Sequence, residues 1–161
     1  MAKDAQQDTA NRIVRTARIE VAAAPDEAFP LLTPAGEGLW SEDWSPVHHH
    51  PEGGIPEEGA VFTTAEGPRG GRIWTILDYA PAQHRIAYLS LAPGFLHIWI
   101  TIECRATGEG NTEAEITYVY TALSDAGRAY LAKMTSSAFQ EQVGHWEHAI
   151  NHYLRSGGTR T

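Results

Sequence analysis

The chain has 161 residues, of which 42% are hydrophobic and 20% are charged, proportions that are typical of one soluble globular domain. Its formal net charge of −8, from 20 acidic and 12 basic residues, argues against nucleic acid as a partner, because the two would repel each other. No apolar run reaches the roughly 18 residues of a membrane helix, so membrane insertion is not expected either.

The chain opens with a polar lead, residues 1–11, that lacks the apolar core of a secretory signal and is expected to be disordered. With only one cysteine in the chain, this favours a cytoplasmic setting. Residues 12–25 alternate apolar and charged positions, which predicts a strand with one buried face. The prolines that follow exclude one long helix, so we predict two short helices at about residues 25–33 and 35–41.

The next 80 or so residues alternate between strand patterns and turn signals, which predicts an antiparallel meander. Glycine- and proline-rich turns such as the one at residues 66–71 separate the runs. The predicted strands cover residues 59–65, 72–81, 84–94, 95–107 and 112–123.

Residues 124–155 carry apolar side chains at helical spacing and predict one long C-terminal helix that begins at the N-cap Ser124. A flexible tail, residues 156–161, follows. The apolar stripe of this helix needs a partner, and the concave face of the sheet is the only large one available. The fold class is therefore α+β: a curved antiparallel sheet of six to seven strands wrapped around the C-terminal helix, with the two short helices after the first strand.

Several stretches in this order resemble the SRPBCC or START-like helix-grip superfamily, which includes pollen-allergen-like and polyketide cyclase/dehydrase-like proteins. They are "IEVAAAPDEAFPLLTPAGEGLW", "WSP" at 44–46, "GAVFTT", "IWTILDYAPAQHRIAY" and "ITYVYTALSDAG". The resemblance spans about residues 13–155 and implies a single domain, placed at residues 12–155, with a hydrophobic internal cavity for a lipid-like or aromatic small molecule. The superfamily shares no catalytic motif, so the resemblance assigns no catalytic residue.

Strand alternation and helical spacing place a set of candidate ligand-binding residues around such a cavity. The tyrosine, threonine and glutamine side chains would orient the ligand, and the apolar ones would supply affinity. The alternative is a filled core in which these polar groups pair with one another. The candidates are Trp40, Trp44, Phe62, Trp74, Tyr88, Ile98, Ile100, Tyr118, Tyr120, Thr135, Phe139 and Gln142.

Two histidine clusters raise the question of a metal. His48, His49 and His50 lie between prolines and form either a polar loop or a segment at the pocket rim. His145, His148 and His152 share one side of the final helix, a spacing that suits zinc, but this side lies beside the apolar stripe and is expected to face solvent. We expect no metal and no cofactor, although the sequence leaves metal binding by either cluster open.

No catalytic constellation is recognised, so the catalytic residues are unknown. Asp78 would share a strand face with Trp74 and could act as a base if buried, whereas Cys104 lacks a basic activator and is interpreted as a small buried hydrophobe. The predicted function is binding of a small hydrophobic molecule, and the alternative is a polyketide cyclase/dehydrase-type enzyme that uses the same cavity. A chaperone-associated protein-interaction module is the further alternative if Trp99 and Val119 form an exposed apolar patch, and a homodimer is predicted if a second copy of the chain covers Trp99.

Overall fold

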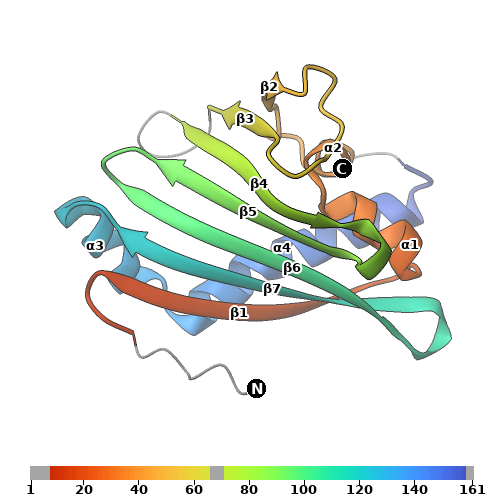
Figure 1. Cartoon of the computed structure of the whole chain (residues 1–161). Helices are drawn as coiled ribbons and strands as arrows, with labels where there is room; N and C mark the ends of the chain where they lie inside the picture. Colours follow the sequence, from red (N-terminus) through yellow and green to blue (C-terminus); the bar gives the residue numbers. More distant parts are fainter. Residues whose placement is uncertain (1–7, 66–70, 159–161) are drawn as a thin grey trace.

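The computed structural model describes residues 8–65 and 71–158, so the ends of the predicted lead and tail, and most of the predicted turn at 66–71, lie outside the described residues. One seven-stranded sheet dominates it, in the order β1-β7-β6-β5-β4-β3-β2, and each neighbouring pair is antiparallel (Figure 1). The strands are β1 (Arg12–Val21), β2 (Val47–His50), β3 (Val61–Thr64), β4 (Arg72–Ala80), β5 (Arg85–Ala92), β6 (Leu96–Thr107) and β7 (Asn111–Ala122).

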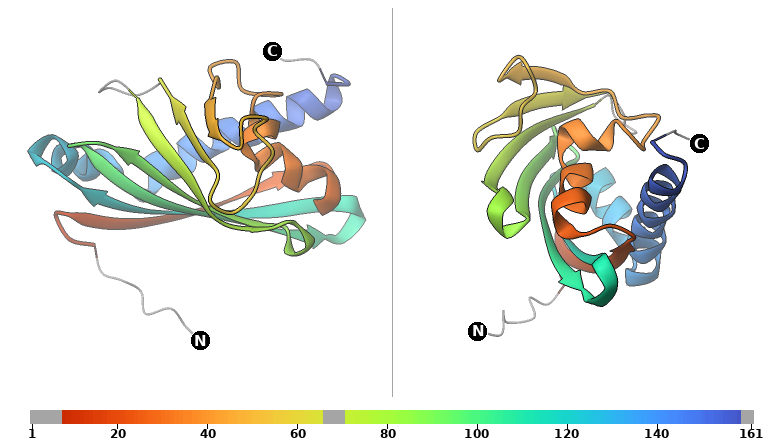
Figure 2. Two further views of the ribbon diagram at one scale, coloured as in Figure 1. Left: turned by 45° about the horizontal axis from the view of Figure 1, so that its top comes forward. Right: turned by 90° about the vertical axis from the view of Figure 1, so that its right-hand side faces the viewer.

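Helices lie on one side of this sheet and at its ends. Figure 2 shows the sheet curving around α4, with the short helices that follow β1 at one end of the concave side. This arrangement confirms the predicted helix-grip fold. The helices are α1 (Pro25–Ala28), the 3-10 turn η1 (Phe29–Leu32), α2 (Pro34–Glu37), the 3-10 turns η2 (Pro81–Gln83) and η3 (Gly108–Gly110), α3 (Asp125–Lys133) and α4 (Ser136–Arg155).

The prediction of one helix over residues 124–155 is wrong, because the chain breaks between α3 and α4. Thr135 is extended, with φ −69° and ψ 165°, and its hydroxyl accepts a hydrogen bond from the backbone N–H of Ala138. Ser124 caps α3 in the same way. A threonine that can satisfy the free N–H groups of a new helix therefore interrupts an otherwise continuous apolar pattern.

The long helix is held over the sheet by a buried apolar face and by polar contacts with β1. Phe139, Val143 and Ile150 of α4 are almost completely buried. The amide of Asn151 accepts from the backbone N–H of Ala22 at 2.9 Å and donates to the carbonyl of Glu20 at 2.8 Å. These bonds fix the position of α4 relative to the edge of the sheet, and with it the width of the space between them. None of the helices in the described part of the chain is long and apolar enough to cross a membrane.

Candidate ligand cavity

A hollow lies between the sheet, α4 and the short helices, and it has two compartments. We call the first the tryptophan compartment; it measures about 60 Å³ and lies at the α2 end of the sheet. Its walls are mostly aromatic and aliphatic. They comprise Leu32, Glu37, Trp40, Trp44, Trp74, Tyr88, Ile100, Ile102, Tyr118 and Trp146.

The second compartment lies toward α3 and is larger and more polar. It measures about 170 Å³, and we call it the tyrosine compartment. Its lining residues are Arg72, Trp74, Ile98, Ile100, Tyr118, Tyr120, Tyr130 and Gln142. Because Trp74, Ile100 and Tyr118 line both compartments, the two are neighbours that share one wall.

The register of the sheet explains how these side chains meet. Ile100 of β6 lies opposite Tyr88 of β5 on one side and opposite Tyr118 of β7 on the other. Ile98 of β6 likewise lies opposite Tyr120 of β7. Since side chains two residues apart share one face of a strand, the alternating pattern of β7 brings both tyrosines to the concave side. Strand alternation therefore predicts most of this wall correctly.

Three of the four tryptophans that line the tryptophan compartment already use their indole N–H groups inside the protein. Trp40 donates to the carbonyl of Leu31 at 2.7 Å, and Trp44 donates to the carbonyl of Pro34 at 2.8 Å. Trp74 donates to the hydroxyl of Thr64 at 2.9 Å. With these donors satisfied, Trp40, Trp44 and Trp74 offer a ligand apolar ring surface and no hydrogen bond.

The tyrosine hydroxyls differ in how they are paired. Tyr88 donates to the carbonyl of Leu32 at 3.0 Å. Tyr120 is 1% exposed, and its hydroxyl has no hydrogen-bond partner among the described residues. A buried hydroxyl without a partner costs about 1–3 kcal/mol, so this group is available to a molecule that enters the cavity.

Burial keeps the tyrosines neutral. Loss of solvation raises the pKa of Tyr88 and Tyr118 well above the usual value for a phenol, and it raises that of Tyr120 as well. The nearby Glu37 carboxylate raises the pKa of Tyr118 further, whereas the Arg72 guanidinium lowers it. At neutral pH these phenols are protonated and can donate hydrogen bonds, and Tyr118 is influenced by both an acidic and a basic side chain.

The predicted ligand-binding set missed six lining residues. Three are apolar or aromatic residues of the tryptophan compartment, and the others include two charged side chains; the six are Leu32, Glu37, Arg72, Ile102, Tyr130 and Trp146. Arg72 is the first residue of β4, beside a glycine-rich turn, a place where a charged side chain normally faces solvent. The signal that could have found it is its spacing of two residues from Trp74, which places both side chains on the same strand face.

Three of the predicted ligand-binding residues do not line either compartment. Phe62 stacks behind Trp74, with ring centroids 5.7 Å apart. Phe139 packs against Tyr118 at 5.1 Å and forms part of the solid core. Thr135 is exposed because its hydroxyl caps α4, so its predicted place in the cavity is corrected.

Asp78 is also absent from the cavity. A bulge in the β4–β5 pairing falls between Ile76 and Asp78 and reverses the alternation of the strand. Asp78 therefore lies on the outer side, where it accepts a hydrogen bond from Arg85 at 2.8 Å. The idea that Asp78 shares a face with Trp74 and serves as a buried base is wrong.

The histidine clusters lie outside the cavity lining. His48 to His50 form the edge strand β2, not a loop: His49 contacts the Thr63 hydroxyl at 3.0 Å, and His50 contacts Glu57 at 3.1 Å. His145 and His148 are exposed on α4 and His152 is partly buried. Within residues 8–65 and 71–158, no group of three or more His, Cys, Asp or Glu side chains is arranged to hold a metal.

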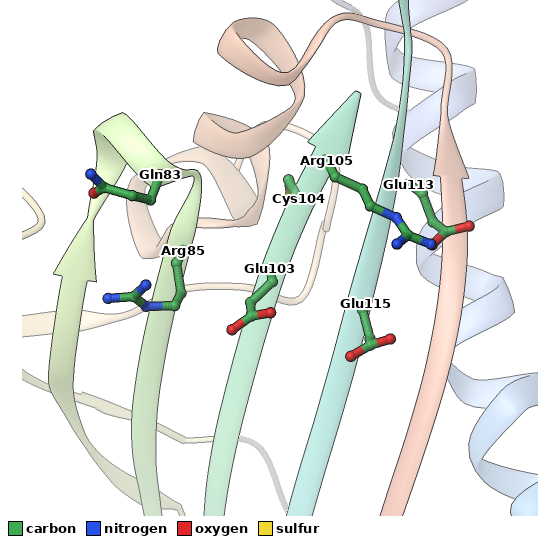
Figure 3. A pocket seen from close by; sticks show the side chains of 7 residues that line it. All are labelled: Gln83, Arg85, Glu103, Cys104, Arg105, Glu113 and Glu115. Carbon is green, nitrogen blue, oxygen red and sulfur yellow. The ribbon is translucent and has the colours of Figure 1, made fainter. Parts of the chain in front are cut away.

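A further depression of about 260 Å³ lies on the outer face of the sheet, and Figure 3 shows charged side chains projecting from neighbouring strands around it. These charges form ion pairs: Arg85 with Asp78 at 2.8 Å, and Arg105 with Glu113. Such exposed ion pairs contribute little to the stability of the protein, and their charges keep this face of the sheet in contact with water. On the same outer face Trp99 is 49% exposed, beside the partly buried Val119.

The family model described as "Polyketide cyclase / dehydrase and lipid transport" matches residues 12–149, which is most of the chain. The chain belongs to this family. Membership of the polyketide cyclase/dehydrase and lipid transport family confirms the helix-grip resemblance read from the sequence. A search of curated proteins finds no significant sequence match.

Solved structures with the same fold are numerous but distant from this family member in sequence. Norcoclaurine synthase from Thalictrum flavum, solved with dopamine and hydroxybenzaldehyde, is 12% identical with a TM-score of 0.66, over 90% of this chain and 87% of that one. Ara h 8.0201 is 14% identical with a TM-score of 0.64, over 90% and 99% of the chains. The di-domain ARO/CYC BexL of the BE-7585A biosynthetic pathway is 16% identical with a TM-score of 0.64, over 89% and 46%.

Proposed function

We propose that the chain binds a small hydrophobic molecule in the two-compartment cavity between the sheet and α4. The observation that carries this proposal is the wall of four tryptophan rings, three of which, Trp40, Trp44 and Trp74, use their N–H groups within the protein. Such a wall favours apolar or aromatic ligand surface, and each square ångström of ligand that it covers contributes about 25 cal/mol.

The volume of the cavity favours a compact ligand over a long lipid. The compartments measure about 60 and 170 Å³. Pockets for drug-sized molecules usually measure about 300–1,000 Å³, whereas an apolar cavity of about 150 Å³ is enough for benzene. A ligand of one or two rings, or a short aliphatic chain, therefore suits this protein best.

Mass spectrometry of compounds extracted from natively purified protein, followed by calorimetric titration of what is found, tests the proposal. Ile100→Phe fills the shared wall of the two compartments and should lower affinity at least about tenfold. Thr101→Phe adds the same ring to the next position of β6, on the opposite face, and should leave affinity unchanged. Equal effects of the two variants, or the absence of any bound or binding compound, would contradict the proposal.

The second candidate is an enzyme of the polyketide cyclase/dehydrase type. The observation that favours it is the neutral phenol of Tyr118 between the charges of Glu37 and Arg72. In an aldol-type ring closure, a carbanion carbon of a poly-β-ketone attacks one of its own carbonyls, and Tyr118 would donate a proton to the oxygen that becomes negative.

Turnover of a poly-β-ketone thioester distinguishes the two functions. If the protein is such an enzyme, Tyr118→Phe should abolish cyclisation with little change in substrate affinity. Tyr79→Phe is the matched control, because Tyr79 stacks on Phe29 at 6.2 Å and lines neither compartment.

A further inference from the structure

We propose that the tyrosine compartment is an anion subsite, in which Arg72, Tyr120 and Gln142 hold the carboxylate of a small aromatic or aliphatic acid. The body of this ligand would lie against Trp74 and extend into the tryptophan compartment. This inference rests on the proposed binding function and narrows its ligand class from hydrophobic molecules in general to monocarboxylates with a compact apolar body.

The first observation is that the Arg72 guanidinium forms no ion pair with a carboxylate among the described residues. Arg72 is partly buried, its guanidinium donates to the hydroxyl of the fully buried Ser90 at 3.4 Å, and no carboxylate of the described chain lies within ion-pair distance of it. A guanidinium carries five N–H donors, so most of this donor capacity is directed elsewhere. Other arginines of the described chain do pair with carboxylates, namely Arg15, Arg18, Arg85, Arg105 and Arg128.

The second observation is independent of the first. The Tyr120 hydroxyl, on a side chain that is 1% exposed, forms part of the same wall and has no partner among the described residues. A buried donor without an acceptor is rare in folded proteins. An acceptor group of a ligand beside Arg72 would satisfy both residues at once.

The remaining polar groups agree with an anion. Gln142 of α4 and Tyr130 of α3 line the compartment and can donate hydrogen bonds, and none of its lining side chains among residues 8–65 and 71–158 is acidic. Glu37 lines the tryptophan compartment instead. A carboxylate ligand would therefore be attracted to the Arg72 end of the cavity, with its apolar body toward the tryptophan compartment, which gives it one orientation.

Carboxylate is the anion that this geometry favours. A guanidinium binds a planar carboxylate through two parallel hydrogen bonds, and the Tyr120 phenol can add a third. The volume of about 170 Å³ suits a one- or two-ring acid. A dianionic phosphate would meet one cation, Arg72, among the described residues that line this compartment.

Isothermal titration with 1-naphthoate and its neutral isostere 1-naphthamide tests the subsite. The native protein should bind naphthoate about tenfold or more tightly than naphthamide. Arg72→Met should remove this preference while naphthamide binding stays within about twofold, and Arg72→Lys should restore part of it. Tyr120→Phe should weaken naphthoate binding by about three- to tenfold. The matched control is Arg105→Met, on the outer face, which should change neither affinity.

The possible results separate this inference from the proposed function. If naphthamide binds as tightly as naphthoate and Ile100→Phe blocks both, the cavity binds ligands but the anion subsite is refuted. If Arg72→Met keeps the preference for naphthoate while its thermal unfolding remains cooperative, the subsite is also refuted. If neither compound binds and no extracted compound is found, both the subsite and the proposed function are overturned.

Discussion

The rings of Trp40 and Trp146 lie 6.3 Å apart between centroids, although more than one hundred positions separate them in the chain. Trp40 follows α2 and is held by its hydrogen bond to Leu31, whereas Trp146 belongs to α4 and also contacts Tyr118 at 6.3 Å. This pair closes the tryptophan compartment between the short helices and the long helix. The size of the cavity therefore depends on how these two elements are held together.

Removing one of the two rings should enlarge the cavity at a moderate cost in stability. We expect Trp146→Ala to lower the free energy of unfolding by about 2 kcal/mol, less than the 3–5 kcal/mol of a fully buried tryptophan, because this ring is partly exposed. The variant should also accept three-ring compounds that the native protein excludes. Urea unfolding and calorimetric titration measure the two effects.

Trp99→Ala is the control for this prediction, since Trp99 is 49% exposed on the outer face of the sheet. Its unfolding free energy should change by no more than about 1 kcal/mol, and its ligand range should not change. A Trp146→Ala protein with native stability and native ligand selectivity would show that the ring does not close the compartment.

The contact between α4 and β1 should be sensitive to a single amide. Asn151→Asp keeps the acceptor for the Ala22 N–H but replaces the donor to the Glu20 carbonyl by a carboxylate oxygen. We expect a loss of about 1–3 kcal/mol in unfolding free energy at pH 7, because two oxygens then face each other. Asn151→Asp should recover part of this loss near pH 4, where the new carboxyl group becomes protonated and can donate. A loss that is independent of pH would contradict the assignment of the amide as donor.

The fold could be predicted from sequence because its signals are local and repeated. Strand alternation predicts the meander and the inward position of Tyr118, and helical spacing predicts α4. The failures have specific causes. Nothing in the sequence around Leu77 marks the bulge that turns Asp78 outward, since bulges are set by pairing with the neighbouring strand. The apolar pattern continues across Thr135, so helical spacing alone does not reveal that this residue begins a new helix.

The apolar walls of the candidate site and its uncharged polar groups, such as Tyr120 and Gln142, could be predicted from the sequence, whereas its charged residues could not. Tryptophans and isoleucines on inward positions identify the walls, whereas Arg72 and Glu37 carry charges that favour a surface interpretation. Their place in the cavity depends on how the end of β4 and the end of α2 lie across the concave face, which is a tertiary relationship. For Arg72, the signal that could have found it is its position at the start of β4, on the same strand face as Trp74.

The close approach of α3 to the sheet depends on a glycine. A Cβ atom at Gly127 would lie 2.2 Å from the carbonyl oxygen of Phe95, a backbone atom that cannot move freely. We expect Gly127→Ala to lower the unfolding free energy by about 1–3 kcal/mol and to shift α3 away from the sheet. Thermal or urea unfolding measures the loss.

Gly144→Ala is the matched control for Gly127→Ala, because a Cβ atom at Gly144 of α4 would meet nothing within 4 Å. This substitution should raise the unfolding free energy by about 0.5–1 kcal/mol, as alanine is favoured over glycine inside a helix. If both substitutions stabilise the protein equally, the contact between α3 and the Phe95 backbone is not a tight one.

Buried Cys104 should make the protein less stable in alkali. Burial raises the pKa of this thiol to about 12, from an ordinary value near 9. Below pH 9 the thiol is protonated in both states and the shift has no effect; above pH 9 only the unfolded state loses its proton, so stability falls with rising pH until about 12. We expect a loss of about 1 kcal/mol between pH 8 and pH 10 that Cys104→Ala removes, measured by urea unfolding. The native thiol should also resist a disulfide reagent at pH 8 until urea unfolds the chain, and immediate reaction would show that Cys104 is accessible.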